Sequence, residues 1–485
     1  MRHAVAGAVI FSLALMGGID AGKSQSEASG EPRGVPAAVA VARTTMIPDC
    51  TLFVDAAGEG GDGSASKPHA TIGAAVDAAT PGAVICVAEG TYEEQLSPGV
   101  KYFTLAGGFQ RGTDFKVRDS AKHVAKAVGK SGSFIRIEDP GPSGDQLTAI
   151  DGFDISGYSQ AIFRDYYESQ RFDITNNVIH DNVCADQSLA GAGFALNNVS
   201  GTIKGNVFAN NACGRGGAGF LNDTTNKNSV SIENNWIEGN SGTEPDSAHG
   251  GALYLFGNTL NIVGNTFINN SVTQWGAGLY VGAFTPGNQP TTATLAWNVY
   301  RGNRAGDGGG GFFCDDGATC ESDHEIYDRN CGGNILVDGG AGGSGPTIAR
   351  FNHITNIGAL EPGCEAPGAG LFIDTYEGVA ADAYSITNAI FWGNAPDRDV
   401  VTACSSGCGA IKIAISHSMV QTKYVDGSIA VGFGEGIVGP ADPLFVAPEK
   451  GDFHLQPGSP AIGKGNPTGT DLGAYGNSGG ASGAP

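Results

Sequence analysis

Residues Asn265–Gly282 read NTFINNSVTQWGAGLYVG, and this stretch decides the fold. An asparagine opens it, a large apolar residue follows two positions later, and glycines precede a second apolar run. Segments of this form recur, and the asparagines that open them are Asn177, Asn206, Asn235, Asn265 and Asn298. Their spacings are 29, 29, 30 and 33 residues. A period near 30 residues is typical of a repeat protein rather than of separate compact domains.

Each repeat places apolar side chains at fixed distances from its asparagine. The positions three residues before and two residues after are apolar or aromatic, and the position four residues before is polar. The apolar sets are Ile174, Ile203, Ile232, Ile262, Leu295 and Ile179, Phe208, Ile237, Phe267, Tyr300; the polar set is Asp173, Thr202, Ser231, Asn261, Thr294. The neighbouring polar and apolar positions indicate short strands with one face turned inward.

Glycine motifs mark a second corner in each repeat. They read GAGF, GGAL, GAGL or GGGF, and they begin at Gly191, Gly217, Gly250, Gly276, Gly309 and Gly368. The pattern predicts an all-β solenoid whose coils stack about 4.8 Å apart, with like residues above like. Apolar ladders fill the interior, the asparagines form an internal amide ladder, and glycines adopt the positive φ of tight corners.

The rest of the composition agrees with an all-β chain. Gly reaches 78 of 485 residues and helix formers are scarce. The net charge of −22 disfavours nucleic acid as a partner, and it disfavours polyanions unless a cation or a basic patch intervenes. We expect a monomer.

Both ends of the repeat array differ from its middle. Residues 50–105 form the N-terminal cap and first coils, in which HATIGAAVDAA (69–79) is predicted to be an amphipathic helix that plugs the open end. The β coils follow over 106–440. The Pro- and Gly-rich segment 441–476 is expected to close the far end, ahead of a tail over 477–485.

The N-terminus has the features of an export signal. Arg2 and His3 precede an apolar run over 4–16, and small residues follow, so we predict a signal peptide over 1–21 and a flexible leader over 22–49. The run is shorter than the roughly 20 residues of a membrane span. We therefore expect the protein outside the cell or on its surface.

Ten cysteines follow the signal, and an even number in an exported chain indicates disulfides. The expected participants are Cys50, Cys86, Cys184, Cys213, Cys314, Cys320, Cys331, Cys364, Cys404 and Cys408. Cys50 and Cys86 would tie the cap together. Cys184 and Cys213 each lie seven residues after a ladder asparagine, so coil stacking makes them neighbours.

Three further segments resemble a known superfamily. They are the opening VDAAGEGGDGSASKPHATIGAAVDAA (54–79), the strand VICVAEGTYEE (84–94) and the ending PLFVAPEKGDFHLQPGSPAI (443–462). The first two, together with the repeats, resemble the right-handed parallel β-helix superfamily typified by pectate lyases. The ending is similar to the C-terminal segment of many secreted bacterial β-helix proteins of undefined activity. The alternation of GGAL or GAGL with NTFINN is also similar to the repeats of polymorphic outer membrane proteins. The resemblance implies a right-handed, single-stranded helix with three sheets, and a groove on one sheet that binds polysaccharide.

One column of residues suits such a groove. Arg215, His249, Trp275 with Gln274, and Asp307 come just before the glycine corners of four consecutive coils. A cation, an imidazole, an indole and a carboxylate in one column would bind sugar and perform acid–base chemistry. The alternative is a solvated corner with variable residues.

A second candidate is the loop from Cys314 to Cys331. Its acidic residues are Asp315, Asp316, Glu321, Asp323, Glu325 and Asp328. The first four are candidate ligands of Ca²⁺, and Asp315 and Asp316 are candidate glycosidase carboxylates. The alternative is an exposed charged loop held by a disulfide.

Lys227 is a third candidate, as the base of a polysaccharide lyase. It begins a coil, and Arg215 would then supply the cation that stabilises developing charge. Lys204 and Glu233 should instead form an ordinary ion pair between coils.

The sequence thus predicts a secreted β-helix protein that binds extracellular polysaccharide. Cleavage by β-elimination and cleavage by hydrolysis both stay open. The alternative function is that of a non-enzymatic, adhesin-like surface protein.

Overall fold

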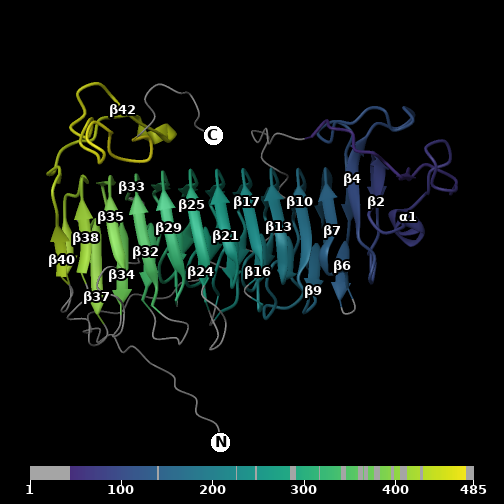
Figure 1. Cartoon of the computed structure of the whole chain (residues 1–485), viewed down its shortest axis with the longest axis horizontal. Helices are drawn as coiled ribbons and strands as arrows, with labels where there is room; N and C mark the ends of the chain where they lie inside the picture. The colour runs from purple at the N-terminus through teal and green to yellow at the C-terminus, as the bar shows by residue number, and fades with distance from the viewer. Residues whose placement is uncertain are drawn as a thin grey trace, which may run out of the picture. The chain divides into compact units, whose positions relative to one another are not determined.

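The computed structural model describes residues 44–138, 141–225, 227–245, 248–283, 291–315, 317–339, 346–358, 364, 370–375, 383–394, 398–404, 412–425 and 430–476. The predicted signal peptide, most of the leader, the tail and the glycine motif at Gly368 lie outside these ranges. The unit from Val35 onward is a stack of coils that contribute strands to three long parallel sheets (Figure 1). Within the described ranges no helix has the length and apolar content needed to cross a bilayer.

Three sheets of 14, 11 and 11 described strands run the length of the stack. The first sheet contains β1 (Leu52–Val54), β2 (Ala83–Ala88), β4 (Phe103–Phe109), β7 (Gly144–Asp151), β10 (Gln170–Thr175), β13 (Val199–Lys204), β17 (Ser229–Glu233), β21 (Thr259–Val263), β25 (Thr292–Ala296), β29 (Thr319–Asp323), β32 (Ile348–Asn352), β35 (Tyr384–Thr387), β38 (Lys412–Ser416) and β40 (Ala430–Phe433). The second contains β3 (Gly90–Tyr92), β5 (Ala125–Val128), β8 (Phe153–Ser156), β11 (Val178–His180), β14 (Val207–Ala209), β18 (Trp236–Glu238), β22 (Thr266–Ile268), β26 (Val299–Arg301), β30 (Ile326–Asp328), β33 (Thr355–Ile357) and β36 (Ile390–Trp392). The third contains β6 (Ile135–Glu138), β9 (Ile162–Asp165), β12 (Phe194–Asn197), β16 (Gly219–Asn222), β20 (Leu253–Phe256), β24 (Leu279–Gly282), β28 (Phe312–Cys314), β31 (Ile335–Asp338), β34 (Leu371–Thr375), β37 (Val400–Cys404) and β39 (Lys423–Val425).

Shorter elements complete the described structure. The short strands β15 (Ala212–Cys213), β19 (Ser241–Gly242), β23 (Ser271–Val272) and β27 (Arg304–Ala305) form a fourth parallel sheet. The remaining elements are the helix α1 (Ile72–Ala78), the 3₁₀ turn η1 (Pro448–Lys450) and the antiparallel pair β41 (Phe445–Ala447) and β42 (Asp452–Leu455).

The strand register confirms the predicted apolar ladders. Ile174 pairs with Ile203, and the series continues through Ile232 and Ile262 to Leu295. The second series, from Ile179 to Tyr300, is likewise in register along the second sheet. Both belong to one continuous buried core. Parallel stacking therefore places like side chains on like, as the repeat requires.

The predicted asparagine ladder is present, and each amide bridges two coils. The backbone N–H and the side-chain amide of Asn206 both donate to Oδ1 of Asn235, at 3.0 Å each. A second ladder lies five residues further along each coil, and its members are Asn182, Asn211, Asn240, Asn270, Asn303 and Asn330. The two ladders flank the three-residue strands of the second sheet and satisfy the buried backbone groups of both corners.

One glycine corner differs from the predicted alignment. The backbone pairing aligns Gly216, not Gly217, with Gly250, and Gly216 has φ 55° where Gly250 has 64°. The motif in this coil therefore begins one residue earlier than its GAGF letters suggest. Two adjacent glycines leave this phase ambiguous in sequence, because only the backbone conformation distinguishes them.

The predicted helix lies at the N-terminal end of the stack (Figure 1). Thr71 accepts a hydrogen bond from the Ala74 N–H as the N-cap, and the Glu94 carboxylate accepts from the first two N–H groups of α1. Ile72 and Val76 pack into the main core. The helix thus covers apolar surface beside β1 and β2.

The C-terminal segment packs against strands of the second sheet. The sequence had instead predicted that this segment closes the far end of the stack. Phe445, Phe453 and Leu472 form an apolar cluster with Ile326 of β30 and Ile390 of β36. Figure 1 shows this segment in yellow. Its apolar burial is what attaches it to the coils.

Disulfides join Cys50 to Cys86, Cys184 to Cys213, Cys314 to Cys320 and Cys331 to Cys364. Cys404 is also disulfide-bonded, while Cys408 lies outside the described ranges. The Cys184–Cys213 bond joins consecutive coils.

Candidate functional site

A column of large side chains covers the outward face of the third sheet. Strand pairing contributes one residue per coil, in the order Phe163, Ala195, Phe220, Tyr254, Tyr280, Phe313, Leu336 and Phe372. The ring centroids of Phe220 and Tyr254 lie 5.7 Å apart, and those of Tyr254 and Tyr280 lie 4.9 Å apart. Such ring contacts stabilise the outer face beyond the burial of their area.

A hollow of about 360 Å³ interrupts this column. Ala195 lines it at a column position where the coils on either side carry Phe163 and Phe220. The small side chain leaves open the volume that a ring would fill. Phe163 and Phe220 both stay partly exposed at the hollow. The Arg136 guanidinium lies 4.3 Å from the Phe163 ring centroid and covers one face of that ring, so a ligand has the other face.

Polar side chains also line the hollow: the guanidinium of Arg215 and the amides of Gln160, Asn197 and Asn222. Asn197 and Asn222 pair in the next outward row of the sheet, and the Asn197 amide donates to Asp165 at 2.9 Å. The Arg215 guanidinium lies 2.7 Å from the Glu244 carboxylate, which offsets its charge. Apolar rings beside amides are the usual lining of a site for an uncharged polar ligand.

The lining offers no group suited to acid–base catalysis. Among the described residues that line the hollow there is no Asp, Glu, His or Lys side chain. The Asp165 and Glu244 carboxylates and the His249 imidazole contact lining residues instead. Burial raises the pKa of Tyr254, the one phenol there, so it remains protonated across the physiological range. The arrangement can bind a ligand through its rings and amides.

The structure brings three of the four predicted column positions into register. Ala190 pairs with Arg215, and His249 pairs with Trp275. The rings of His249 and Trp275 lie 5.2 Å apart, and His249 also stacks on Tyr254 at 5.8 Å. The imidazole thus packs among rings next to the hollow.

The fourth predicted position was wrong by one residue. Trp275 pairs with Gly308, so Asp307 stands just before the column. The Asp307 N–H donates to the backbone carbonyl of Gln274 at 2.8 Å, and neither side chain lines the hollow. Residues 308–311 are all glycine, so the sequence does not show which residue of this coil aligns with Trp275.

The lysine candidates lie on the first sheet, away from the hollow. Lys227 is exposed just before β17, and its backbone N–H donates to Asp223. It does not line the hollow with Arg215, so the predicted pair of lyase residues is not brought together there. Lys204 lies 2.9 Å from Glu233 and pairs with it in register, as an ordinary ion pair between coils.

The acidic loop does not assemble as a calcium site in the described residues. Asp315 is buried and accepts the Tyr280 hydroxyl hydrogen bond, whereas Glu321 is exposed on β29 and pairs with Arg350 at 3.1 Å. Asp316 lies outside the described ranges. Asp323 belongs to another cluster, with two histidines, which is the only group of three potential metal ligands in the described residues. Calcium therefore stays a prediction without a described set of ligands.

Two other acids of that loop are interior. Glu325 is fully buried and accepts hydrogen bonds from the backbone and side-chain amides of Asn298, at 3.0 Å each. Asp328 is fully buried and pairs with Arg301 and Arg329 at 2.6 and 2.7 Å. The expected exposed loop was wrong here, because residues 319–328 are two strands of a regular coil.

Sequence reasoning missed the aromatic column itself. The sequence does contain a pattern that marks this column. The second residue of four consecutive strands of the third sheet is aromatic: Phe220, Tyr254, Tyr280 and Phe313. These positions were overlooked because apolar residues were assigned to the interior. Both faces of the third sheet are apolar, and a two-residue alternation does not identify such strands.

The comparison with family models agrees with the architecture. The family model described as "Right handed beta helix region" matches residues 161–352. Among solved structures, the pectate lyase Pel9A shares 11% identity over 90% of this chain and 97% of its own, with a TM-score of 0.37. The deglycosylated pectin methylesterase from Aspergillus niger shares 13% identity over 82% and 89%, with a TM-score of 0.22. A search of curated proteins finds no match.

Proposed function

We propose that this chain, a right-handed parallel β-helix, binds an uncharged glycan in the hollow at Ala195 and does not cleave it. The observation that carries this proposal is the gap in the aromatic column. A sugar ring presents an apolar face of C–H groups and an edge of hydroxyls. The exposed rings of Phe163 and Phe220 suit the face, and the amides of Asn197 and Asn222 suit the edge.

Electrostatics favours an uncharged glycan over an acidic one. The chain carries a net charge of −22, which repels polyanions at long range. Arg215 is the one cationic side chain in the described lining, and Glu244 lies 2.7 Å from it. A uronate would therefore meet little net positive charge.

The disulfides support a location outside the cytosol. Disulfides persist in oxidising compartments, and polysaccharides are abundant outside cells. We therefore place the proposed binding activity at the cell surface or in the medium. The proposal keeps the polysaccharide partner and the surface role that the sequence suggested. It assigns binding alone in place of cleavage.

The proposal predicts that glycan binding depends on the hollow. Titration calorimetry against a panel of neutral and acidic polysaccharides should detect binding to a neutral one. Phe220→Ala should weaken that binding about 5-fold, because it removes a ring contact worth about 1 kcal/mol. Ala195→Phe should abolish binding by filling the hollow. Phe372→Ala, in the same column but outside the hollow, is the matched control and should bind normally.

Two results would contradict the proposal. One is binding that survives Ala195→Phe, which would place the ligand elsewhere. The other is product formation, followed as new reducing ends and as absorbance at 232 nm, since the hollow has no acid or base. Reducing ends with absorbance at 232 nm would indicate β-elimination, and Lys227 would be the candidate base. Reducing ends without that absorbance would indicate hydrolysis, and Asp315 would be the candidate carboxylate.

A further inference from the structure

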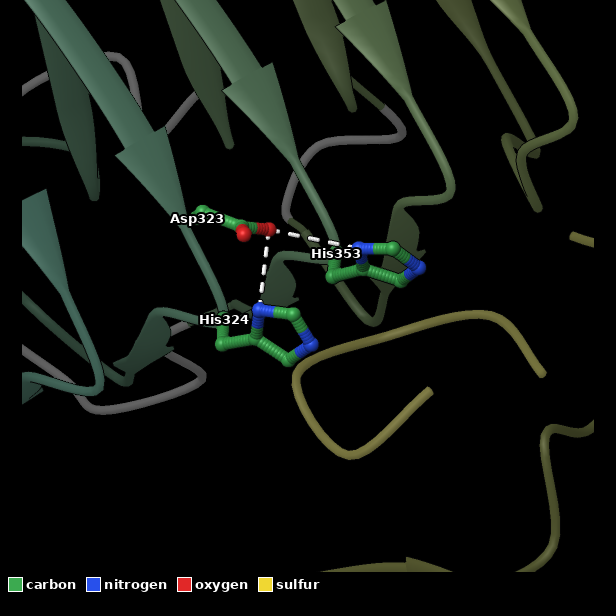
Figure 2. Close-up of side chains that lie close together, drawn as sticks. All are labelled: Asp323, His324 and His353. Carbon is green, nitrogen blue, oxygen red and sulfur yellow. Dashed lines mark hydrogen bonds and ion pairs between the residues drawn. The ribbon is translucent and has the colours of Figure 1, made fainter. Parts of the chain in front are cut away.

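Two histidines and an aspartate meet at one corner of the stack, outside the glycan hollow. Asp323 ends β29, His324 follows it, and His353 follows β32 in the next coil. Oδ1 of Asp323 lies 2.9 Å from Nδ1 of His324 and 3.2 Å from Nδ1 of His353 (Figure 2). The two imidazole rings stack at 4.5 Å. Strand register produces this meeting, because Asp323 pairs with Asn352.

The cluster is held rigidly. Trp297, from the preceding coil, stacks on His324 at 4.2 Å, so three rings from three coils form one stack. His324 is 8% exposed and His353 is 3% exposed. The Asn352 amide donates to Asp323 Oδ1 at 2.9 Å and orients the carboxylate. Preorganised ligands lose little entropy on binding an ion.

The hydrogen bonding of the two imidazoles is incomplete. Nε2 of His324 and Nε2 of His353 are buried and have no hydrogen-bond partner among the described residues. If each Nδ1–H donates to Asp323, each Nε2 keeps a buried lone pair. If the protons are on Nε2 instead, the Nδ1 lone pairs face the carboxylate and repel it. Either tautomer leaves nitrogen lone pairs unsatisfied, which is costly in a buried site.

We propose that Asp323, His324 and His353 form a binding site for a divalent transition-metal ion. One ligand atom from each residue lies within 4.8 Å of the other two. Ligands about 2.1 Å from a tetrahedral ion are separated by roughly 3.4 Å. Oδ1 of Asp323, at 2.9 and 3.2 Å from the two Nδ1 atoms, therefore needs to move by only a few tenths of an ångström relative to each imidazole. An ion between Oδ1 of Asp323 and the two Nδ1 atoms takes both Nδ1 lone pairs and balances the carboxylate charge, and each Nε2 then carries the ring proton.

The donor set selects the class of ion. Two imidazoles and one carboxylate suit Zn²⁺, Co²⁺, Ni²⁺ or Cu²⁺, whereas Ca²⁺ takes six to eight oxygen ligands. His324 also lines a cavity of about 240 Å³ beside the C-terminal segment, which leaves room for water as a fourth ligand. Arg301 and Lys450 line the same cavity, and the pairing of Arg301 with Asp328 at 2.6 Å reduces its repulsion of a cation.

The test is metal binding by the whole chain after treatment with a chelator. Titration calorimetry with Zn²⁺ should give one site, and Co²⁺ should develop a visible absorption band at the same stoichiometry. Ca²⁺ should give neither signal. His324→Asn and His353→Asn should each weaken Zn²⁺ binding by about 100-fold or more, since each removes a ligand.

Asparagine is the substitution of choice because it keeps the corner intact. His324 and His353 adopt φ of 57° and 45°, and Asn176 and Asn234 occupy the same corner of other coils at 53° and 51°. His417→Asn is the matched control: it is the same change at the same corner, φ 43°, without the carboxylate. Absence of a one-site signal overturns the proposal. So does binding that the two variants leave unchanged, or that His417→Asn weakens equally.

Discussion

Asn235→Ala is expected to lower the free energy of unfolding by about 3–5 kcal/mol. The Asn235 amide donates to the Ile203 carbonyl at 2.8 Å and to Asn265 Oδ1 at 2.9 Å. It accepts from the backbone N–H and the side-chain amide of Asn206, at 3.0 Å each. Alanine leaves the Asn206 backbone N–H and the Ile203 carbonyl buried without these partners. Each unsatisfied group costs about 1–3 kcal/mol, and the remaining loss comes from the cavity.

Denaturant unfolding followed by tryptophan fluorescence measures this effect. Trp236 directly follows the mutated residue, so its emission reports on the affected coil. Asn261→Ala is the matched control, because Asn261 is an exposed asparagine on the neighbouring coil. It should change stability by no more than about 0.5 kcal/mol. A loss below about 1 kcal/mol for Asn235→Ala would mean that the ladder does not carry the stability assigned to it.

Glu325→Gln is expected to stabilise the protein at pH 8 by on the order of 3–5 kcal/mol. Burial raises the pKa of Glu325 to about 8, although hydrogen bonds from Asn298 act to lower it. The folded protein therefore retains the carboxyl proton at neutral pH, while the unfolded chain releases it near pH 4.5. Stability from this group is fully present below pH 4.5 and is lost as the pH rises through 8. Glutamine offers Asn298 the same acceptor oxygen with no proton to lose.

The measurement is the free energy of unfolding at pH 5, 6, 7 and 8 for both proteins. The advantage of Glu325→Gln should be small at pH 5 and should grow with each step. Glu321→Gln, at an exposed position on the same coil, is the control and should show no such growth. Parallel pH profiles for Glu325→Gln and the natural protein would contradict a protonated Glu325 in the folded state.

The coil stack was predictable because its signal is periodic. Ile174, Ile203 and Ile232 occupy the same phase, and parallel in-register pairing turns equal spacing into direct contact. The same logic placed Cys184 beside Cys213 and Lys204 beside Glu233. The prediction failed where a residue type departed from the repeat. Glu325 occupies the asparagine position of its coil, but a carboxylate among other acids suggested an exposed loop.

The candidate sites depend on features that do not repeat. The hollow exists because one coil has Ala195 where its neighbours have rings. The glycine corner at Gly217 and the column residue Asp307 were each misaligned by one residue. The histidine cluster joins residues 29 positions apart that share no motif. Outward side chains meet according to their rotamers and the local corner conformation, neither of which is constrained by the interior repeat.

The sequence by itself determined the solenoid, its period, its interior ladders and most of its coil-to-coil neighbours. The physical reason is that every coil must bury the same apolar face on the next coil, so the same apolar positions recur in each repeat. Only the tertiary structure decided which outer face is aromatic, where that face opens, and where two buried imidazoles share a carboxylate. These features arise where a repeated position carries an unrepeated residue type, and their contacts exist only after the coils have stacked.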